Sequence, residues 1–356
     1  MAPWILAVNP GSTSTKVACF DGEVEIWREE ATHAPQELAG FPSIAAQFEL
    51  RASDVEQAMR AHGLRADSLG AVVGRGGLLR PLRGGTYRVD EALCAELLLA
   101  ERGSHASNLG APLALRIARQ APCPAFIVDP VVTDEFTDTA HESGVEGIRR
   151  RSLLHALNQR AMAKRAASAL GERYEELRIV VAHIGGGVSV GLHHMGQIVD
   201  ANDGLDGDGP LAPERSGSLP LFEIWTRHAD GRIDLRAVLD RISGKGGLVD
   251  LVGTADLRRI PDEGRGAQVR AALALGIARE CGRQAALCGW PVDALVLTGG
   301  GAHDARLVRA VLRRAEFLAK RCFVFPGEAE MQALAQGALR ALLGLEPALD
   351  YAQGHA

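Results

Sequence analysis

The chain has 356 residues, of which 47% are hydrophobic and 23% charged, values close to the average for soluble globular proteins. This length predicts about two domains and excludes a single small module, while the composition excludes a disordered or fibrous chain. A net charge of -5 provides no general field for a polyanion, and no stretch is apolar for long enough to form a membrane helix. We therefore expect neither nucleic acid nor a membrane as a partner, and a cytoplasmic location.

The predicted elements of the first half begin with three antiparallel strands. An apolar run at 4–9 precedes a loop of small residues, and a second strand follows at 16–20. Asp21-Gly22 is a strong signal for a two-residue hairpin, and residues 23–27 alternate between charged and apolar types. Further along, the sequence predicts helices at 53–63, opened by a capping box at Ser53, and at 108–119, and strands at 69–73 and 125–128.

The second half repeats this pattern. A helix is predicted from Ser152 to Gly171, then strands at 178–183, 188–192 and 197–200. The separation along the chain is the same from Asn9 to His183, from Gly11 to Gly185 and from Gly22 to Gly196, which favours a duplicated domain. The remaining predicted elements are a strand at 293–298 and helices at 265–287, 304–320 and 328–343.

Mixed strands and helices in each half predict an α/β fold. We expect a first domain over residues 1–150 and a second over 151–327, with the last helical segment, about 328–356, completing the first domain.

Loops of glycine and hydroxyl residues follow the first strand of each half. Such loops expose backbone N–H groups and hydroxyls at close range, an arrangement that binds phosphate oxygens. For either loop alone, a simple tight hairpin is an equally good interpretation. The first loop is not a Walker P-loop, because Lys16 enters a strand, and residues 185–187 lack the spacing of a dinucleotide-binding fingerprint. Two loops at matching positions favour the phosphate chain of a nucleotide.

Polar side chains close to glycines or strand ends are the candidate catalytic groups. Arg75 stands between glycines, Asp129 follows an apolar strand, and His183 ends a strand beside three glycines. His105 and Arg215 belong to polar loops, where such residues are often only exposed to solvent. Together these groups suit phosphoryl transfer, in which positioning and charge neutralisation supply most of the catalysis.

A series of short motifs, read in order from about Ile5 to Tyr351, resembles the acetokinase family. Each motif alone would be weak, but the ordered set is specific. The motifs are Asn9-Pro-Gly-Ser-Thr-Ser-Thr-Lys16, Gly74-Arg-Gly-Gly77, His105-Ala-Ser-Asn-Leu-Gly110, Asp129-Pro-Val-Val132, His155-Ala-Leu-Asn-Gln159, Ala182-His-Ile-Gly-Gly-Gly187, Pro213-Glu-Arg-Ser-Gly217, Leu297-Thr-Gly-Gly300 and Pro326-Gly-Glu328.

The resemblance implies two ribonuclease-H-like domains related by duplication, with the active site in an interdomain cleft. It implies ATP or ADP with Mg²⁺, a short-chain or branched-chain carboxylate as acceptor, and a homodimer or larger homo-oligomer. The motif wording is closer to the butyrate-specific branch of the family than to the acetate-specific one. An acetate or propionate kinase remains the alternative, and a non-catalytic nucleotide switch of the actin or chaperone type is the alternative from another class.

The resemblance also implies a role for each matching residue. Arg75 and Arg215 would hold the acid's carboxylate and the migrating phosphoryl group, and His105 and His183 would bond phosphoryl oxygens. Asp129 would be catalytic on the magnesium side, where Glu328 is the second implied ligand. The implied nucleotide-binding residues are Asn9, Gly11, Ser12, Thr13, Lys16, Gly185, Gly186, Gly187, Thr298, Gly299 and Gly300.

The implied reaction is a direct, in-line attack by a carboxylate oxygen on the γ-phosphorus of ATP, which gives an acyl phosphate and ADP. No general base is required, because a carboxylate is already ionised at pH 7. The chain departs from the family pattern at Gly301-Ala-His-Asp304, where Leu-Ala-Tyr-Ser is common, and at Ala329, where an acid is common.

Overall fold

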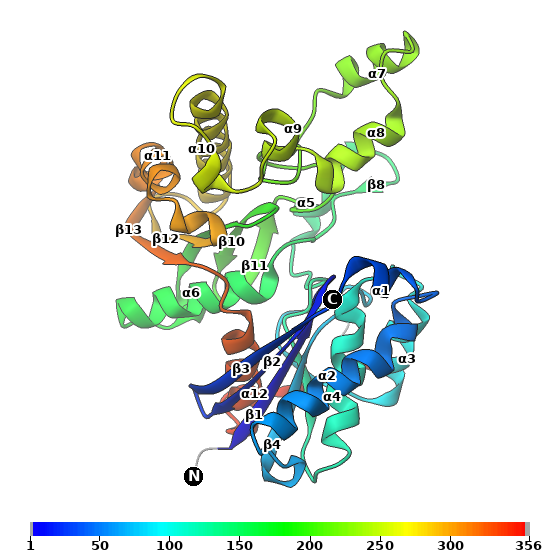
Figure 1. The fold of residues 1–356 in the computed structure, drawn as a ribbon. Helices are drawn as coiled ribbons and strands as arrows, with labels where there is room; N and C mark the ends of the chain where they lie inside the picture. The colour runs from blue at the N-terminus through cyan, green and yellow to red at the C-terminus, as the bar shows by residue number, and fades with distance from the viewer. Residues whose placement is uncertain (1–2, 353–356) are drawn as a thin grey trace. The chain divides into compact units, whose positions relative to one another are not determined.

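The computed structural model describes residues 3–352 and divides into two compact units (Figure 1). The first unit comprises residues 1–134 and 329–356, and the second comprises 135–328. The last four residues of the expected C-terminal segment, 353–356, lie outside the described residues. The division after Asp134 precedes the boundary expected at 150/151, because Arg150 is bound to the second unit through the carboxylate of Asp200.

The first unit contains a seven-stranded mixed sheet with the order β14-β5-β6-β4-β1-β2-β3. Its strands are β1 (Trp4–Pro10), β2 (Ser14–Asp21), β3 (Val24–Thr32), β4 (Leu69–Arg75), β5 (Thr86–Arg88), β6 (Ala125–Val128) and β14 (Ala348–Asp350), and its α-helices are α1 (Pro35–Ala39), α2 (Phe48–Ala61), α3 (Glu91–Leu99), α4 (Gly110–Ala118) and α12 (Glu330–Leu342). Strands β1, β2 and β3 form the predicted antiparallel meander, and β1, β4 and β6 run parallel to one another.

Helices pack on both faces of this sheet. On one face, Leu6 and Val8 of β1 share a core with Val55 of α2 and Ile117 of α4. On the other face, α12 contacts β1, β4 and β6. Full burial of side chains of this kind contributes about 1.5–3 kcal/mol each, so the two layers of helices hold the sheet edge that carries the candidate residues.

The second unit contains a five-stranded sheet with the order β11-β10-β9-β12-β13 and a separate two-stranded hairpin. Its strands are β7 (Glu142–Val145), β8 (Ile148–Arg149), β9 (Arg178–Ile184), β10 (Val188–His194), β11 (Gln197–Ala201), β12 (Val292–Gly299) and β13 (Ala319–Pro326), and its α-helices are α5 (Asp138–His141), α6 (Ala156–Leu170), α7 (Leu221–Ala229), α8 (Leu235–Asp240), α9 (Leu248–Val252), α10 (Gly264–Ala286) and α11 (Ala305–Ala315).

The strand directions in the second sheet follow those in the first. Strands β9, β10 and β11 are antiparallel neighbours, and β12 runs parallel to both β9 and β13. The order β11-β10-β9-β12-β13 therefore has the same directions as β3-β2-β1-β4-β6. Val180 and Ala182 of β9 share a core with α10 and α11, while α6 contacts β9 and β12.

Two helix starts differ from the sequence prediction. Ser53 lies inside α2, which begins at Phe48, and its hydroxyl accepts a hydrogen bond from the Gln57 side chain instead of capping the helix. The capping-box prediction was therefore wrong. Helix α6 begins at Ala156 and not at Ser152, although it ends as predicted at Gly171, which adopts a left-handed conformation with φ of 73°.

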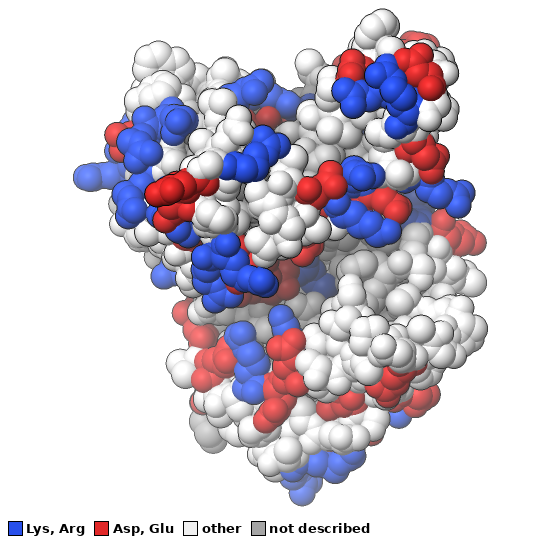
Figure 2. All heavy atoms as spheres, turned by 45° about the horizontal axis from the view of Figure 1, so that its top comes forward, with Lys and Arg blue, Asp and Glu red and all other residues white. Residues whose placement is uncertain are grey.

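Figure 2 shows basic and acidic side chains interspersed on the visible surface. Exposed ion pairs of the protein include Arg116 with Glu49. Within residues 3–352, no helix is long and apolar enough to span a membrane. The six cysteines are free thiols, three of them buried, and burial raises the pKa of Cys19 to about 11 and that of Cys94 to about 12. Cys322 is exposed.

Candidate active site

Three predicted residues of the first unit lie where neighbouring parallel strands end. Asn9 is near the end of β1, Arg75 ends β4, and Asp129 directly follows β6. Arg75 is in register with Val128, the residue before Asp129. Because the carboxyl ends of parallel strands meet at one edge of a sheet, an amide, a guanidinium and a carboxylate are gathered there, in the position where α/β sheets bind ligands.

Glu330, the first residue of α12, joins two of these side chains. Its Oε2 accepts a hydrogen bond of 2.8 Å from Asn9 Nδ2, and its Oε1 forms an ion pair with Arg75 Nη1. The sequence interpretation did not include Glu330. A signal was present, since this acid lies two residues after Glu328 and opens the helix that returns to the first unit.

Glycines bring His105 close to Arg75. A Cβ on Gly74 would lie 2.1 Å from the carbonyl oxygen of Gly110, so only glycine allows β4 to approach the segment that begins at His105. Partial burial, with smaller contributions from the positive charges of Arg75 and Arg51, lowers the pKa of His105. Its Nδ1 accepts a hydrogen bond of 3.2 Å from the backbone N–H of Ser107, so the neutral ring carries its proton on Nε2.

Asp129 is buried and has a φ of 38°, an uncommon conformation for a residue other than glycine. Its Oδ1 accepts a hydrogen bond of 2.8 Å from the N–H of Gly85, while its own N–H donates to the Gly85 carbonyl. The surrounding backbone thus holds this carboxylate in a strained position, as is frequent for functional residues.

The first predicted phosphate loop is the β1–β2 hairpin. The N–H of Gly11 donates to the Ser14 carbonyl at 2.7 Å, so it is used within the hairpin, whereas Ser12 and Thr13 are exposed at the tip. Lys16 lies on β2 opposite Asn9 and is partly exposed. Beneath the loop, the fully buried Arg51 donates a 2.9 Å hydrogen bond to the same Ser14 carbonyl. Arg51 was not identified from the sequence, because it appears there as one more helix arginine.

In the second unit, His183 is the next-to-last residue of β9 and is almost completely buried. Its Nδ1 lies 2.9 Å from Asn158 Oδ1, and its Nε2 lies 3.6 Å from Glu328 Oε1. The ring stacks on that of His155, with centroids 4.0 Å apart and planes 15° apart. His155 and Asn158 belong to one of the quoted motifs, but the sequence interpretation gave them no role. His183 Nε2 and Asn158 Nδ2 are buried polar atoms without a hydrogen-bond partner among the described residues.

The second predicted loop, residues 185–187, contacts the segment that carries Arg215. A Cβ on Gly186 would lie 2.6 Å from the carboxylate of Glu214, and a Cβ on Gly187 would lie 1.7 Å from Arg215 Nη1. The same Nη1 donates a 2.7 Å hydrogen bond to the Gly204 carbonyl. Glycine is therefore required at 186 and 187, because any side chain there would displace the carboxylate of Glu214 or the guanidinium of Arg215. Burial lowers the pKa of Arg215, opposed by the charge of Glu214.

Thr298, at the end of β12, lies next to His183 of β9 in the sheet register. Its hydroxyl donates to Asn158 Oδ1 at 3.3 Å. Gly299 exchanges two backbone hydrogen bonds with Gly327, at 3.1 and 2.9 Å, and Gly300 is exposed with open space around its Cα. The second unit thus gathers the predicted histidine, both glycine segments, Arg215, Thr298 and Glu328.

The sequence was compared with protein families and with known proteins. A profile described as the acetokinase family matches residues 139–321. A probable butyrate kinase from Coprothermobacter proteolyticus is 45% identical over 353 residues, which cover 98% of this chain and 99% of that protein. The chain belongs to the acetokinase family.

Solved structures with the same fold are also similar to this acetokinase. Acetate kinase from Porphyromonas gingivalis has 19% sequence identity and a TM-score of 0.73, with 96% of this chain and 100% of that chain covered. A propionate kinase from Francisella tularensis has 16% identity and a TM-score of 0.69, with 94% and 99% covered. These likenesses show that nearly the whole chain has the fold of these solved structures.

Carboxylate oxygens are the protein ligands that Mg²⁺ prefers. Within residues 3–352, no group of three or more His, Cys, Asp or Glu side chains is arranged to hold a metal. Asp129 and Glu328, the two predicted ligands, belong to different units. Each is a carboxylate, the donor type that Mg²⁺ takes from a protein one or two at a time.

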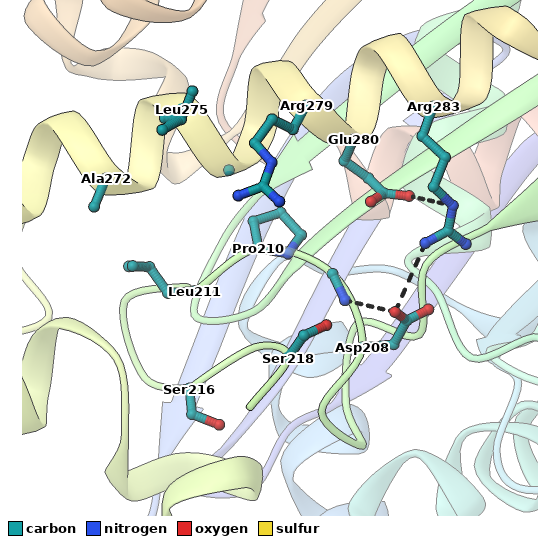
Figure 3. Close-up of a pocket in the computed structure, with 12 residues that line it drawn as sticks. Asp208, Pro210, Leu211, Ser216, Ser218, Ala272, Leu275, Arg279, Glu280 and Arg283 are labelled. Atoms are coloured by element: carbon teal, nitrogen blue, oxygen red, sulfur yellow. Dashed lines mark hydrogen bonds and ion pairs between the residues drawn. The ribbon is translucent and has the colours of Figure 1, made fainter. Parts of the chain in front are cut away.

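A cavity of about 630 Å³ lies beside the segment that carries Arg215 (Figure 3). Arg279, Glu280 and Arg283 of α10 project toward residues 208–218, and Arg283 pairs with Asp208 at 3.8 Å and with Glu280 at 3.4 Å. None of the sequence-predicted site residues lines this cavity. The Arg283–Asp208 ion pair attaches residues 208–218 to α10.

Proposed function

We propose that this acetokinase transfers the γ-phosphoryl group of ATP to a short-chain carboxylate, reversibly, with butyrate as the favoured acceptor. The observation that carries the proposal is the pair of arginines held beside glycine-rich strand ends: Arg75 by Glu330, and Arg215 by the bare backbone of Gly187. Butyrate is favoured because the relative that is 45% identical bears the name probable butyrate kinase.

The arginines supply the charge that the reaction requires. A planar guanidinium can form two parallel hydrogen bonds with a carboxylate or a phosphoryl group, which fixes orientation as well as neutralising charge. In the proposed reaction, Arg75 and Arg215 hold the acid and the migrating phosphoryl group in line. Neither arginine has to move a proton, because the acid is already an anion at pH 7.

His105 and His183 would donate hydrogen bonds to phosphoryl oxygens as charge spreads over them. The lowered pKa of His105 keeps this ring neutral at pH 7, and the Ser107 N–H directs its proton to Nε2. The buried Nε2 of His183 lies near Gly185, where a Cβ would be 3.0 Å away, so this ring faces the second glycine loop.

Nucleotide binding is proposed for the two glycine-bearing strand ends together. Ser12, Thr13 and Lys16 of the first unit and the glycine segments of the second provide donors for phosphate oxygens. The proposed reaction requires both units to contact one ATP and one acid. Mg²⁺, held by Asp129 and Glu328, would neutralise phosphate charge when bound. A reaction that consumes ATP in this way suits the cytoplasm.

We further propose that the units are two ribonuclease-H-like domains related by duplication, with the active site in the cleft between them. The matching strand orders of the two sheets support this. Leu6 and Val180 also occupy equivalent positions in β1 and β9, and each packs against helices in the core of its unit. The C-terminal segment from Ala329 would complete the first domain.

A hydroxylamine-trapping assay tests the proposed reaction. With ATP and Mg²⁺, butyrate or isobutyrate should give a hydroxamate, and a panel from acetate to branched acids should rank butyrate first by kcat/KM. Arg75→Ala and Arg215→Ala should each lower kcat/KM by at least about 100-fold, the scale of losing one oriented transition-state contact. Arg116→Ala, which removes a surface ion pair, is the matched control. Absence of hydroxamate with every acid would refute the proposal.

Self-association through α7 is proposed as well, with a second copy of the chain as the occupant of its apolar face. None of the residues of α7 is buried, and Leu221, Phe222 and Trp225 are 81%, 83% and 64% exposed. Covering these side chains on two copies would remove roughly 1,000 Å² from water, near the minimum for a stable interface. Sedimentation of a Phe222→Ser, Trp225→Ser double variant should show a smaller species, whereas Phe317→Ser should leave the mass unchanged. An unchanged mass for the double variant would exclude this face.

A further inference from the structure

A chain of buried polar side chains leads from His155 into the interior of the second unit. His155 Nδ1 lies 2.8 Å from the hydroxyl of Ser189, a residue of β10 with no exposed surface. The same hydroxyl accepts hydrogen bonds from the Gln159 side-chain amide at 2.9 Å and from the His155 backbone N–H at 3.4 Å. Because two N–H donors already point at this oxygen, its single proton is directed to His155 Nδ1.

The orientation of Gln159 is determined independently. Its Nε2 lies 3.1 Å from the backbone carbonyl of Ser189, which can only accept, so this end of the amide must be the NH₂ group. The Oε1 end then faces His193 Nε2 at 3.2 Å. A Cβ on Gly191 would lie 2.5 Å from this oxygen, so the glycine in the middle of β10 makes room for the amide.

The hydrogen bonds at the far end of this series of side chains have the same donor-to-acceptor direction. Since Gln159 Oε1 accepts, His193 must carry its proton on Nε2, and its Nδ1 accepts from the hydroxyl of Tyr174 at 2.8 Å. Complete burial, with a smaller contribution from Arg160, lowers the pKa of His193 well below its usual value and keeps the ring neutral. Arg160 donates to the Tyr174 oxygen at 3.4 Å, which leaves the tyrosine proton for His193.

We propose that Tyr174, His193, Gln159 and Ser189 are positioning residues that fix His155 as the neutral tautomer with its proton on Nε2. Donor and acceptor are assigned in every one of these hydrogen bonds, and the assignments made from the Ser189 end and from the Tyr174 end are consistent. Reversing one link would leave two acceptors or two donors facing each other in the interior, where an unsatisfied polar group costs about 1–3 kcal/mol. His155 therefore receives a hydrogen bond on one side of its ring and has a donor on the other.

The fixed tautomer matters for the neighbouring ring. His155 stacks on His183 at 4.0 Å, and two imidazolium rings at this distance would repel each other. A neutral His155 limits the stacked pair to a single positive charge. If the protein acts as proposed above, a proton fixed on His155 Nε2 sets the charge and polarity beside His183, and the buried side chains keep that proton in place before any substrate binds.

Nitrogen-15 NMR of histidine-labelled protein without substrates tests the tautomer directly. The shifts of the two ring nitrogens distinguish a protonated nitrogen from an unprotonated one, and the signals lost in a His155→Gln variant identify the residue. We expect an unprotonated Nδ1 and a protonated Nε2 in the unaltered protein at about pH 7. A His155 protonated on Nδ1, or on both nitrogens, would overturn the proposal.

Gln159→Glu tests the donor-to-acceptor direction of these hydrogen bonds, because glutamate has nearly the same shape as glutamine. A carboxylate at this position accepts the Ser189 proton, so the Ser189 oxygen then accepts from His155 Nδ1–H and the tautomer reverses. We expect the NMR signature to move to Nδ1–H and kcat for the carboxylate kinase reaction to fall about 100-fold, with KM for ATP changed less than about threefold. Gln284→Glu is the matched control, since this fully buried glutamine of α10 has no link to His155.

Ser189→Ala removes the last link instead of reversing it, and His155 should then populate both neutral tautomers. If Gln159→Glu and Ser189→Ala are folded by circular dichroism and His155 keeps its Nε2 proton in both, the buried chain does not set the tautomer. An inactive protein with the expected NMR signature would refute the kinase proposal and leave the assignment of the tautomer standing.

Discussion

Replacing Gly187 by alanine is the most direct test of why the second loop is made of glycine. The added Cβ would lie 1.7 Å from Arg215 Nη1 and 2.6 Å from the Gly204 carbonyl oxygen. The backbone carbonyl cannot move easily, so the guanidinium must shift by about 2 Å to reach an ordinary van der Waals contact. That shift breaks the 2.7 Å hydrogen bond that holds Arg215 to Gly204.

The expected effect is a large loss of activity with a smaller loss of stability. A misplacement of about 1 Å can lower a rate about 100-fold, so we expect kcat/KM for butyrate to fall at least about 100-fold in Gly187→Ala. Overpacking of this kind costs about 1–3 kcal/mol in the free energy of unfolding. Hydroxamate formation measures the rate, and urea denaturation followed by circular dichroism measures the stability.

Gly282→Ala is the matched control within the same unit. Gly282 lies in α10, and its added Cβ would be 4.0 Å from Leu318 Cδ1, so alanine fits and improves helix propensity by about 1 kcal/mol. Its activity should equal that of the unaltered protein. A folded Gly187→Ala enzyme with normal kcat/KM would show that Arg215 does not act from its position against the loop.

Three further predictions concern the rest of the molecule. Gly74→Ala should cost at least about 3 kcal/mol in urea denaturation, because its Cβ would lie 2.1 Å from a backbone oxygen, and a smaller loss would contradict the close packing of β4 on the Gly110 segment. Burial lowers the pKa of His193, so as the pH falls the unfolded chain binds a proton at this histidine before the folded protein does. The contribution of His193 to the free energy of unfolding should therefore be fully present above about pH 6.5. Below that pH it should decrease by up to about 1.4 kcal/mol per pH unit. His193→Gln should flatten that fall between about pH 7.5 and about pH 5.5, and an equal fall in both proteins would exclude the group. Chelation should abolish hydroxamate formation, and Asp129→Asn should raise the Mg²⁺ concentration for half-maximal rate at least about tenfold, whereas Asp67→Asn on the exposed surface should not.

Strand positions and glycine loops were the most predictable features, because their signals are local. The antiparallel meander from Trp4 could be identified from alternation and the Asp21-Gly22 turn, and the structure extends its third strand to Thr32. Helix starts were less predictable. Helix α2 begins at Phe48 because Val55 packs it on the core of the first unit, a tertiary contact that outweighs the local capping signal at Ser53.

Residues far apart in the sequence account for most of what was missed at the site. Glu330 contacts Arg75 across 255 positions of the chain, and only the return of α12 to the first unit brings them together. His155 acquires its importance from its stack on His183 and its contact with Ser189, neither of which leaves a local pattern. Arg150 belongs to a run of three arginines in the sequence, and only the structure shows that it is bound to Asp200.

The first unit is assembled from two separate parts of the chain, and this has a consequence for biosynthesis. Residues 135–328 form the second unit from one uninterrupted stretch, so a ribosome delivers that unit complete while the first still lacks α12 and β14. Until those elements emerge, the sheet surface around Val128 that accommodates Gly337 is uncovered. The segment that is synthesised first is therefore among the last to reach its final structure. Its uncovered sheet surface is exposed to aggregation while the whole second unit is translated.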